Sequence, residues 1–145
     1  FTTKIFSNEL EISEVFFSDI ELDEYKLLLI LAALVYEEKK MTRFYKRFNS
    51  KEVYKLRNNL RKIFPNAEWV NNIPRMTGII KPAMEGMSFL EILKNTNFLE
   101  GDLIRVFMQI LDRLEQIDKA SAETNDTVIN CKDIIKKAME GISIV

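Results

Sequence analysis

The run "LLLILAALVY", residues 27–36, would be apolar on every side if it formed a helix. Leu and Ala favour helix strongly, and a helix without a polar face is stable only when protein surrounds it. The run is much shorter than the ~20 residues needed to span a bilayer. We therefore predict that it forms the central helix of a bundle, with Asp23 as the N-cap.

The remaining segments also carry a helical pattern. Apolar residues recur at three- and four-residue spacing, and no segment shows the sustained alternation of a half-buried strand. Further N-caps are predicted at Ser7, Ser50, Ser88 and Asp126. Pro74 suits the start of another helical segment, which we expect Gly78 and Pro82 to interrupt and Gly86 to close. These features predict an all-α, single-domain bundle of about seven helices over residues 1–145.

The composition excludes several kinds of chemistry. The chain has no histidine and a single cysteine, Cys131, and none of its four glycines stands in a phosphate-binding loop motif. Without histidine the chain lacks the usual general base near neutral pH and the ligand of most zinc sites. We therefore expect no catalytic residue, metal site or cofactor in this chain. We interpret Cys131 as a buried packing residue and not as a reactive thiol.

Charge is unevenly distributed although the net charge is only −1. Ten basic residues and one acid, Glu52, lie between Lys39 and Lys62, whereas Glu9 to Glu24 holds seven acids and no base. This asymmetry predicts a polyanionic partner on one side of the molecule.

Aromatic residues interleave with the bases of this stretch, at Phe44, Tyr45, Phe48 and Tyr54. Two interpretations remain open. The stretch is either a nucleic-acid surface or a set of core aromatics covered by the stems of lysine and arginine. In the first interpretation the phosphate contacts are Lys46, Arg47, Lys55 and Arg57.

A second informative stretch is "NFLEGDLIRVFMQILDRLEQI", residues 97–117. Asn97 and Glu100 form an Asn-x-x-Glu capping pair, so the helix is predicted to begin at Phe98. Gly101 costs ~1 kcal/mol relative to alanine inside a helix, and we interpret it as a point where another backbone crosses closely. The predicted core face comprises Leu103, Val106, Phe107, Ile110, Leu114 and Ile117.

Polar residues form a stripe on another face of this helix, at Arg105, Gln109, Asp112 and Gln116. The stripe is either a solvated face or a row of hydrogen-bonding groups that touches a ligand threaded past the helix. Arg105 can pair with Asp102 at i,i+3 spacing, and we expect it to be partly structural, bracing a neighbouring helix. The Gln109 amide both donates and accepts, which suits a base edge or a sugar.

The same stretch resembles the signature of the DSHCT domain, the C-terminal helical domain of superkiller and exosome-type DExH-box RNA helicases. "AALVYE" (32–37), "GIIKPAMEGMSFLEILKNTNFLEGDLIR" (78–105) and "IIKKAMEGISIV" (134–145) resemble further segments of that family in the same order. Because the chain starts at Phe1, inside sequence that already reads as structured, we interpret it as a fragment of a larger helicase.

The resemblance implies a function and partners. In such helicases two RecA-like domains hydrolyse ATP with magnesium, and the helical domain closes one wall of the nucleic-acid channel. The 97–117 helix matches the ratchet helix, whose base contact maps to Gln109, and a further strand contact maps to Glu38. This implies a non-catalytic, cytoplasmic, membrane-free module that contacts single-stranded RNA, or DNA, and RecA-like domains of its own chain. The alternative is a helical protein-interaction domain without nucleic-acid contact.

Overall fold

The computed structural model describes residues 22–36, 43–120 and 125–140. These ranges contain the helices α2 (Glu24–Val35), α3 (Lys51–Ile63), α4 (Ile73–Met84), α5 (Phe89–Leu93), α6 (Glu100–Ala120) and α7 (Asp126–Ala138), with a short 3-10 helix η1 (Glu68–Asn72). Within the described ranges there is no strand beyond an isolated bridge between Phe44 and Thr96. The all-α prediction is confirmed, while the predicted helix with its cap Ser7 lies outside the described residues.

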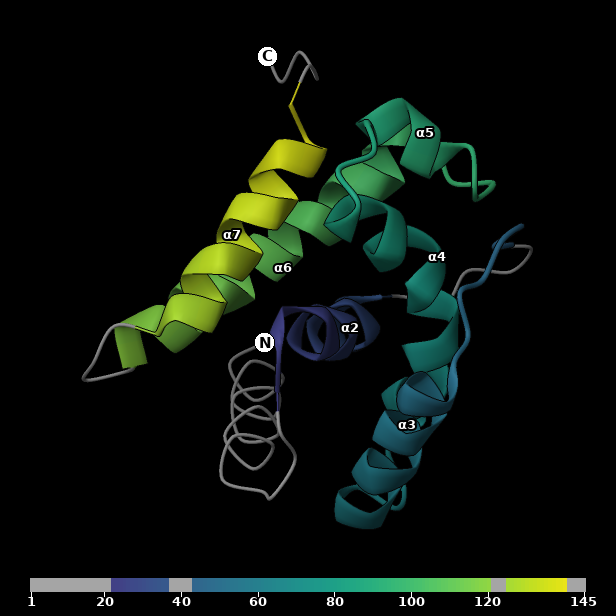
Figure 1. Ribbon diagram of the computed structural model, residues 1–145, viewed down its shortest axis with the longest axis vertical. Coiled ribbons are helices and arrows are strands. Elements are labelled where there is room, and N and C mark those ends of the chain that lie inside the picture. The colour runs from purple at the N-terminus through teal and green to yellow at the C-terminus, as the bar shows by residue number, and fades with distance from the viewer. Residues whose placement is uncertain (1–21, 37–42, 121–124, 141–145) are drawn as a thin grey trace.

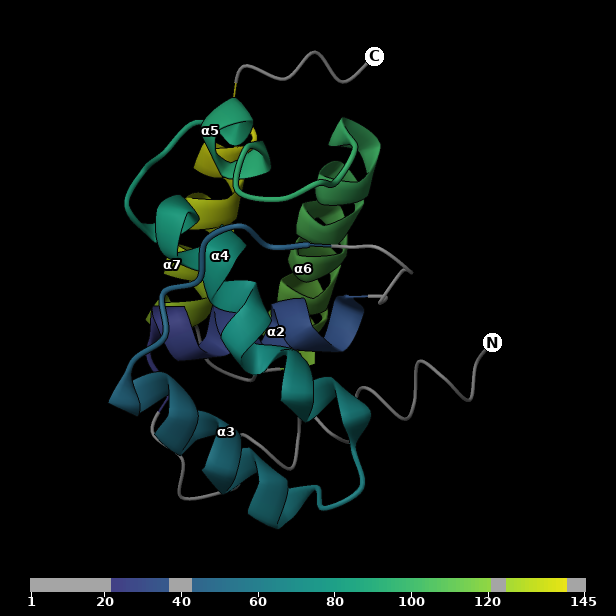
Figure 2. The same ribbon diagram turned by 90° about the vertical axis from the view of Figure 1, so that its right-hand side faces the viewer.

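Helix α2 lies at the centre of the molecule, with α6 and α7 on one side and α3 and α4 on the other (Figures 1 and 2). Every residue from Leu27 to Ala33 is buried, as predicted for a helix that is apolar all round. The Asp23 carboxylate accepts a hydrogen bond from the Lys26 backbone N–H at 2.9 Å, which confirms the predicted N-cap. The most hydrophobic helix is therefore the one that the others cover.

Helix α3 buries much less of its surface. The Ser50 hydroxyl accepts a hydrogen bond from the Val53 backbone N–H at 3.2 Å and caps the helix, as predicted. Only Val53, Leu56 and Leu60 are buried, and they lie on one face. The opposite face of α3 is consequently free to present charged side chains.

Helix α4 corrects a prediction, because it runs without interruption through Gly78 and Pro82. Proline has no N–H to donate to the carbonyl four residues earlier, which here is that of Gly78. The Asn95 side-chain amide donates to this carbonyl oxygen instead, at 3.3 Å. A partner from a later loop thus satisfies the group that Pro82 leaves unpaired, and the helix continues.

The end of α4 agrees with the prediction that Gly86 closes it. Gly86 has φ +81°, the left-handed conformation that glycine adopts most easily. Its N–H donates to the carbonyl of Ala83 at 3.1 Å, and the Met87 N–H donates to that of Pro82 at 3.0 Å. This pair of bonds is the Schellman motif.

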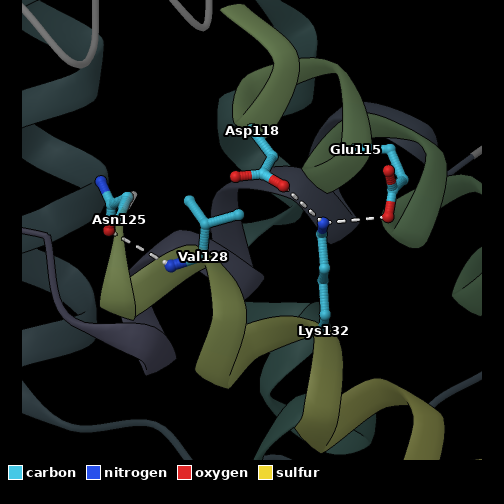
Figure 3. A network of polar contacts seen from close by, with 5 residues as sticks. All are labelled: Glu115, Asp118, Asn125, Val128 and Lys132. Carbon is cyan, nitrogen blue, oxygen red and sulfur yellow. Dashed lines mark hydrogen bonds and ion pairs between the residues drawn. The ribbon is translucent and has the colours of Figure 1, made fainter. Parts of the chain in front are cut away.

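Of the last two predicted N-caps, Ser88 is confirmed and Asp126 is not. Ser88 caps α5 as predicted, since its hydroxyl accepts from the Glu91 N–H at 3.3 Å. The N-cap of α7 is Asn125, whose side chain accepts from the Val128 N–H at 3.3 Å, so the prediction of Asp126 is wrong by one residue (Figure 3). Asp126 occupies the first helical position, where its negative charge interacts favourably with the helix macrodipole.

Helices α6 and α7 are joined by packing and by charge. The predicted buried face of α7 is confirmed within the described residues, at Val128, Cys131, Ile135 and Ala138. The Lys132 ammonium of α7 lies 2.9 Å from the Glu115 carboxylate and 3.0 Å from that of Asp118, both on α6 (Figure 3). The hydrogen bond from Lys132 lowers the pKa of Glu115, and the bonds to Glu115 and Asp118 raise the pKa of Lys132.

Candidate nucleic-acid interface

Helix α6 begins two residues later than predicted, at Glu100 instead of Phe98. The Leu99 carbonyl accepts from the Leu103 N–H at 3.3 Å, and the Asp102 carboxylate accepts from the Leu99 N–H at 3.4 Å. Leu99 therefore stands at the cap position, and Asp102 supplies the returning half of a capping box. The predicted Asn-x-x-Glu pair is wrong because the chain uses Asn97 elsewhere.

Gly101 does not mark a backbone crossing. It is exposed, and a Cβ placed on it would have no atom within 4 Å, so the predicted close approach is wrong. The close approach occurs instead at buried Gly78, where a Cβ would lie 2.6 Å from the Lys46 carbonyl oxygen. Arg105, predicted to brace a helix near Gly101, is exposed. The structure therefore gives no support to the prediction that Arg105 braces a neighbouring helix near Gly101.

The two faces of α6 separate as the periodicity predicts. All six predicted core residues of this helix are buried. On the outer face Arg105 and Asp112 are exposed, while Gln109 and Gln116 are half-buried at its edge. Met108 is 43% exposed beside them. The four polar residues therefore lie together on one face of α6, and the other described helices leave this face at least partly exposed.

The second contact implied by the resemblance, Glu38, lies outside the described residues. Helix α2 ends at Val35, and the Tyr36 N–H donates to the Ala32 carbonyl at 2.9 Å. Trp69, which follows α3, is half-buried and packs against Phe64 with ring centroids 5.5 Å apart. Trp69 is therefore a packing residue.

The basic stretch enters the described part of the chain as an irregular segment, residues 43–50, that is fastened to the loop before α6. The Arg43 N–H donates to the Asn97 side-chain oxygen at 2.8 Å, and the Asn97 N–H donates to the Arg43 carbonyl at 3.2 Å. The Tyr45 N–H donates to the Asn95 carbonyl at 2.7 Å. This is the use of Asn97 that displaces it from the cap of α6.

The same segment is fastened to α4. The Phe48 N–H donates to the buried Thr77 hydroxyl at 2.9 Å, and that hydroxyl donates to the Pro74 carbonyl at 2.7 Å. The Lys46 carbonyl lies over Gly78, where only a residue without a Cβ admits it. The backbone of residues 43–48 is therefore held at several points while its charged side chains remain exposed.

The aromatic residues of the stretch divide between core and surface. Phe44 packs edge-on against Tyr36 and Phe98, with ring centroids at 5.7 and 5.5 Å, and is half-buried against the core. Tyr45, the next residue, is 66% exposed. These two adjacent side chains thus differ in burial, and each of the two sequence interpretations applies to part of the stretch.

Two further aromatics carry a basic side chain over the ring. The Lys46 ammonium lies 5.3 Å from the centroid of Phe48, and the Arg57 guanidinium lies 5.0 Å from that of Tyr54. Both distances fit a cation–π contact. Arg57 is half-buried in this position, so its stem covers the ring as the second interpretation predicts.

One basic residue of the stretch, Arg61, makes hydrogen bonds that stabilise the fold. The Arg61 guanidinium donates to the carbonyls of Ala67 and Pro65 at 2.8 and 3.2 Å, and to the Asn71 side chain at 2.6 Å. It thereby ties the end of α3 to η1. The only acid of the stretch, Glu52, pairs with Lys26 of α2 at 3.3 Å.

Sequence reasoning missed part of the exposed basic surface. Besides the predicted Lys46, Arg47 and Lys55, three bases are exposed on the same segment and helix: Arg43, Lys51 and Lys62. The signal was present in the sequence, because residues 51, 55 and 62 fall on one face of a helix at 3.6 residues per turn.

The described residues hold no group of three potential metal ligands. Cys131 is buried, and burial, with smaller contributions from Glu24 and Asp23, raises the pKa of its thiol to about 12. The thiolate needed for nucleophilic chemistry is therefore not populated near neutral pH. No helix in the described ranges has the length and apolar character required to cross a membrane.

Comparison with known families identifies the family of the chain. The model of the DSHCT (NUC185) domain matches residues 3–143. The chain belongs to the DSHCT family. A DSHCT domain is typically the C-terminal region of a DExH-box helicase, so the resemblance seen in the sequence is confirmed. Neither a curated protein nor a solved structure matches the chain.

The segments that resemble family motifs come together in this DSHCT domain. Within the described ranges they include the end of α2, the stretch from α4 through the first residues of α6, and the end of α7. These helices pack on one another around α2. Helix α3 and residues 43–50 lie outside those motifs, and α3 lies on the far side of α4 from α6 and α7 (Figure 1).

Proposed function

We propose that this DSHCT domain lines the nucleic-acid channel of an ATP-dependent DExH-box helicase and that the outer face of α6 contacts the translocating single strand. ATP and magnesium are bound by RecA-like domains of the same chain, and this domain contributes no catalytic residue. The observation that carries the proposal is the family match together with the exposed polar stripe of α6. RNA is the proposed strand, and DNA is the alternative.

Each residue of the stripe has a chemistry that suits a strand. The amides of Gln109 and Gln116 donate and accept, so they can bond a base edge or a ribose hydroxyl. Both are half-buried, which limits the side-chain entropy lost on binding. Arg105 supplies a positive charge at the start of the helix, and Asp112 can accept from an exocyclic amine or a hydroxyl.

The test is Gln109→Ala in the helicase that contains this domain. Unwinding and strand-stimulated ATP hydrolysis should fall, because the contact to the moving strand is lost. The melting temperature and the salt dependence of binding should hardly change, because Gln109 is uncharged and lies at the edge of the core. The matched control is Asn130→Ala, which removes an exposed amide from α7.

The control should leave every readout unchanged. Normal unwinding by Gln109→Ala would contradict the strand contact. A loss of unwinding that merely follows a lower melting temperature would also contradict it, and would favour a protein-interaction domain.

A further inference from the structure

Six exposed bases follow one another along residues 43–62, and we call them the basic track: Arg43, Lys46, Arg47, Lys51, Lys55 and Lys62. The only acid between residues 43 and 62 is Glu52, and its carboxylate is engaged by Lys26. Arg61 and Arg57 are excluded from the track because both are half-buried, with their guanidinium groups bonded at the end of α3 and packed over the Tyr54 ring, respectively. The positive charge of the track is therefore not neutralised within this stretch.

The α3 part of the track is a row along one face. Lys51, Lys55 and Lys62 follow one another at intervals of four and seven residues, with exposed Asn58 between the last two. At 1.5 Å per residue these intervals are about 6 Å and about 10 Å along the axis. All of the buried residues of α3 lie on its other face. A row of ammonium groups on an open helix face suits successive phosphates of a strand.

The first part of the track is pre-ordered by the fold. Residues 43–50 run from the loop that precedes α6, across α4, to the start of α3 (Figure 2). Their backbone is bonded at Asn97, Asn95 and Thr77, so the side chains of Arg43, Lys46 and Arg47 leave a fixed backbone. The track thus starts beside the beginning of α6 and leads away from it.

We propose that the basic track is a second binding surface for the single strand, distinct from the outer face of α6, and that it holds the strand by its phosphates. For the identity of the partner this inference rests on the proposed function. A protein partner is disfavoured because four of the six track residues are lysines, a residue type that is depleted in protein interfaces. Interleaved bases and aromatic rings are typical of single-strand binding.

The experiment measures binding of the 145-residue chain to a fluorescein-labelled oligouridylate across a salt series. The track variant is Lys51→Gln/Lys55→Gln/Lys62→Gln. The control variant is Lys94→Gln/Lys136→Gln/Lys137→Gln, which removes three exposed charges elsewhere and has the same net charge as the track variant. All six positions are exposed, so both variants should melt like the wild type, and circular dichroism checks this.

Each phosphate contact adds ~0.7 to the log–log salt slope for a single strand, so the track variant should lose about 2 from the magnitude of the slope. The control variant should keep the wild-type slope. Tyr45→Ala should weaken binding by about fivefold or more without changing the slope, because stacking is not electrostatic.

Equal slopes in the two triple variants would overturn the proposal. Competition by poly-glutamate as strong as that by unlabelled oligouridylate would overturn it in favour of non-specific charge, and displacement by an acidic protein alone would make the track a protein surface. Failure of the α6 contact is distinguishable, since Gln109→Ala alters strand-stimulated ATP hydrolysis and leaves the salt slope unchanged.

Discussion

Gly78 shows how one missing side chain allows two segments to meet. The Lys46 carbonyl approaches α4 at the position where any other residue would place a Cβ, at a separation that real Cβ atoms essentially never show. Since the neighbouring atom is backbone, it cannot rotate away. The glycine of α4 therefore permits the segment that carries Arg43, Lys46 and Arg47 to lie against the helix.

Gly78→Ala should destabilise the protein although alanine favours helix over glycine. Overpacking of this kind costs ~1–3 kcal/mol, and the backbone of residues 43–48 must shift to relieve it. Urea unfolding followed by circular dichroism measures the loss. Gly101→Ala is the matched control, because that position is helical and open, and the variant should be up to ~1 kcal/mol more stable than wild type. Equal effects of the two substitutions would show that the crossing at Gly78 is not tight.

At the scale of the element, α3 is attached to the molecule by a narrow apolar face and by its two ends. Ser50 caps its start, and Arg61 bonds the turn and η1 beyond its end. A planar guanidinium with several donors can serve carbonyls and an amide oxygen at once. Of the other charged side chains of α3, Glu52 pairs with Lys26 and Arg57 lies over the Tyr54 ring, whereas Lys51, Lys55 and Lys62 are exposed.

Arg61→Ala should lower the free energy of unfolding by ~1–3 kcal/mol, because it leaves carbonyl oxygens at the α3–η1 turn without their donor. Arg61→Lys should restore little of this, since an ammonium cannot reproduce the fork of the guanidinium. Chemical denaturation gives the values. The neighbouring Lys62→Ala should change stability by no more than ~0.5 kcal/mol, as expected for an exposed residue. A neutral Arg61→Ala variant would contradict the structural role.

At the scale of the whole molecule, the DSHCT domain has two surfaces with different chemistry. The outer face of α6 offers amides and one charge of each sign, whereas α3 and residues 43–50 offer bases and exposed tyrosines. The first is suited to bonds with bases and sugars, the second to phosphates. Between them lie the buried helices α2 and α4, which hold the two surfaces in a fixed relation.

The 145-residue chain alone should bind a single strand without hydrolysing ATP. Its sequence has no phosphate-binding loop and no histidine, so it lacks the groups that position a nucleotide for hydrolysis. Phosphate release in the presence of magnesium, with and without oligouridylate, measures this. Turnover that scales with protein concentration through purification would contradict the assignment of ATP hydrolysis to other domains.

The sequence by itself determined the features that depend on neighbours within one or two helical turns. Helical periodicity, the caps at Asp23, Ser50 and Ser88, and the Gly86 terminus are local, because each bond joins residues only a few positions apart. The central place of residues 27–36 also followed, since an all-apolar helix has a single stable environment. The polar stripe of α6 was predictable for the same reason.

Only the tertiary structure decided the features whose partners are distant in the chain. Asn97 leaves the cap of α6 because its side chain bonds Arg43, 54 residues away. Helix α4 survives Pro82 because Asn95 bonds the Gly78 carbonyl from 17 residues away. Periodicity carries no information about such partners. The same limit applies to the basic stretch, where contacts across the fold separate the bases that support α3 from those that remain exposed.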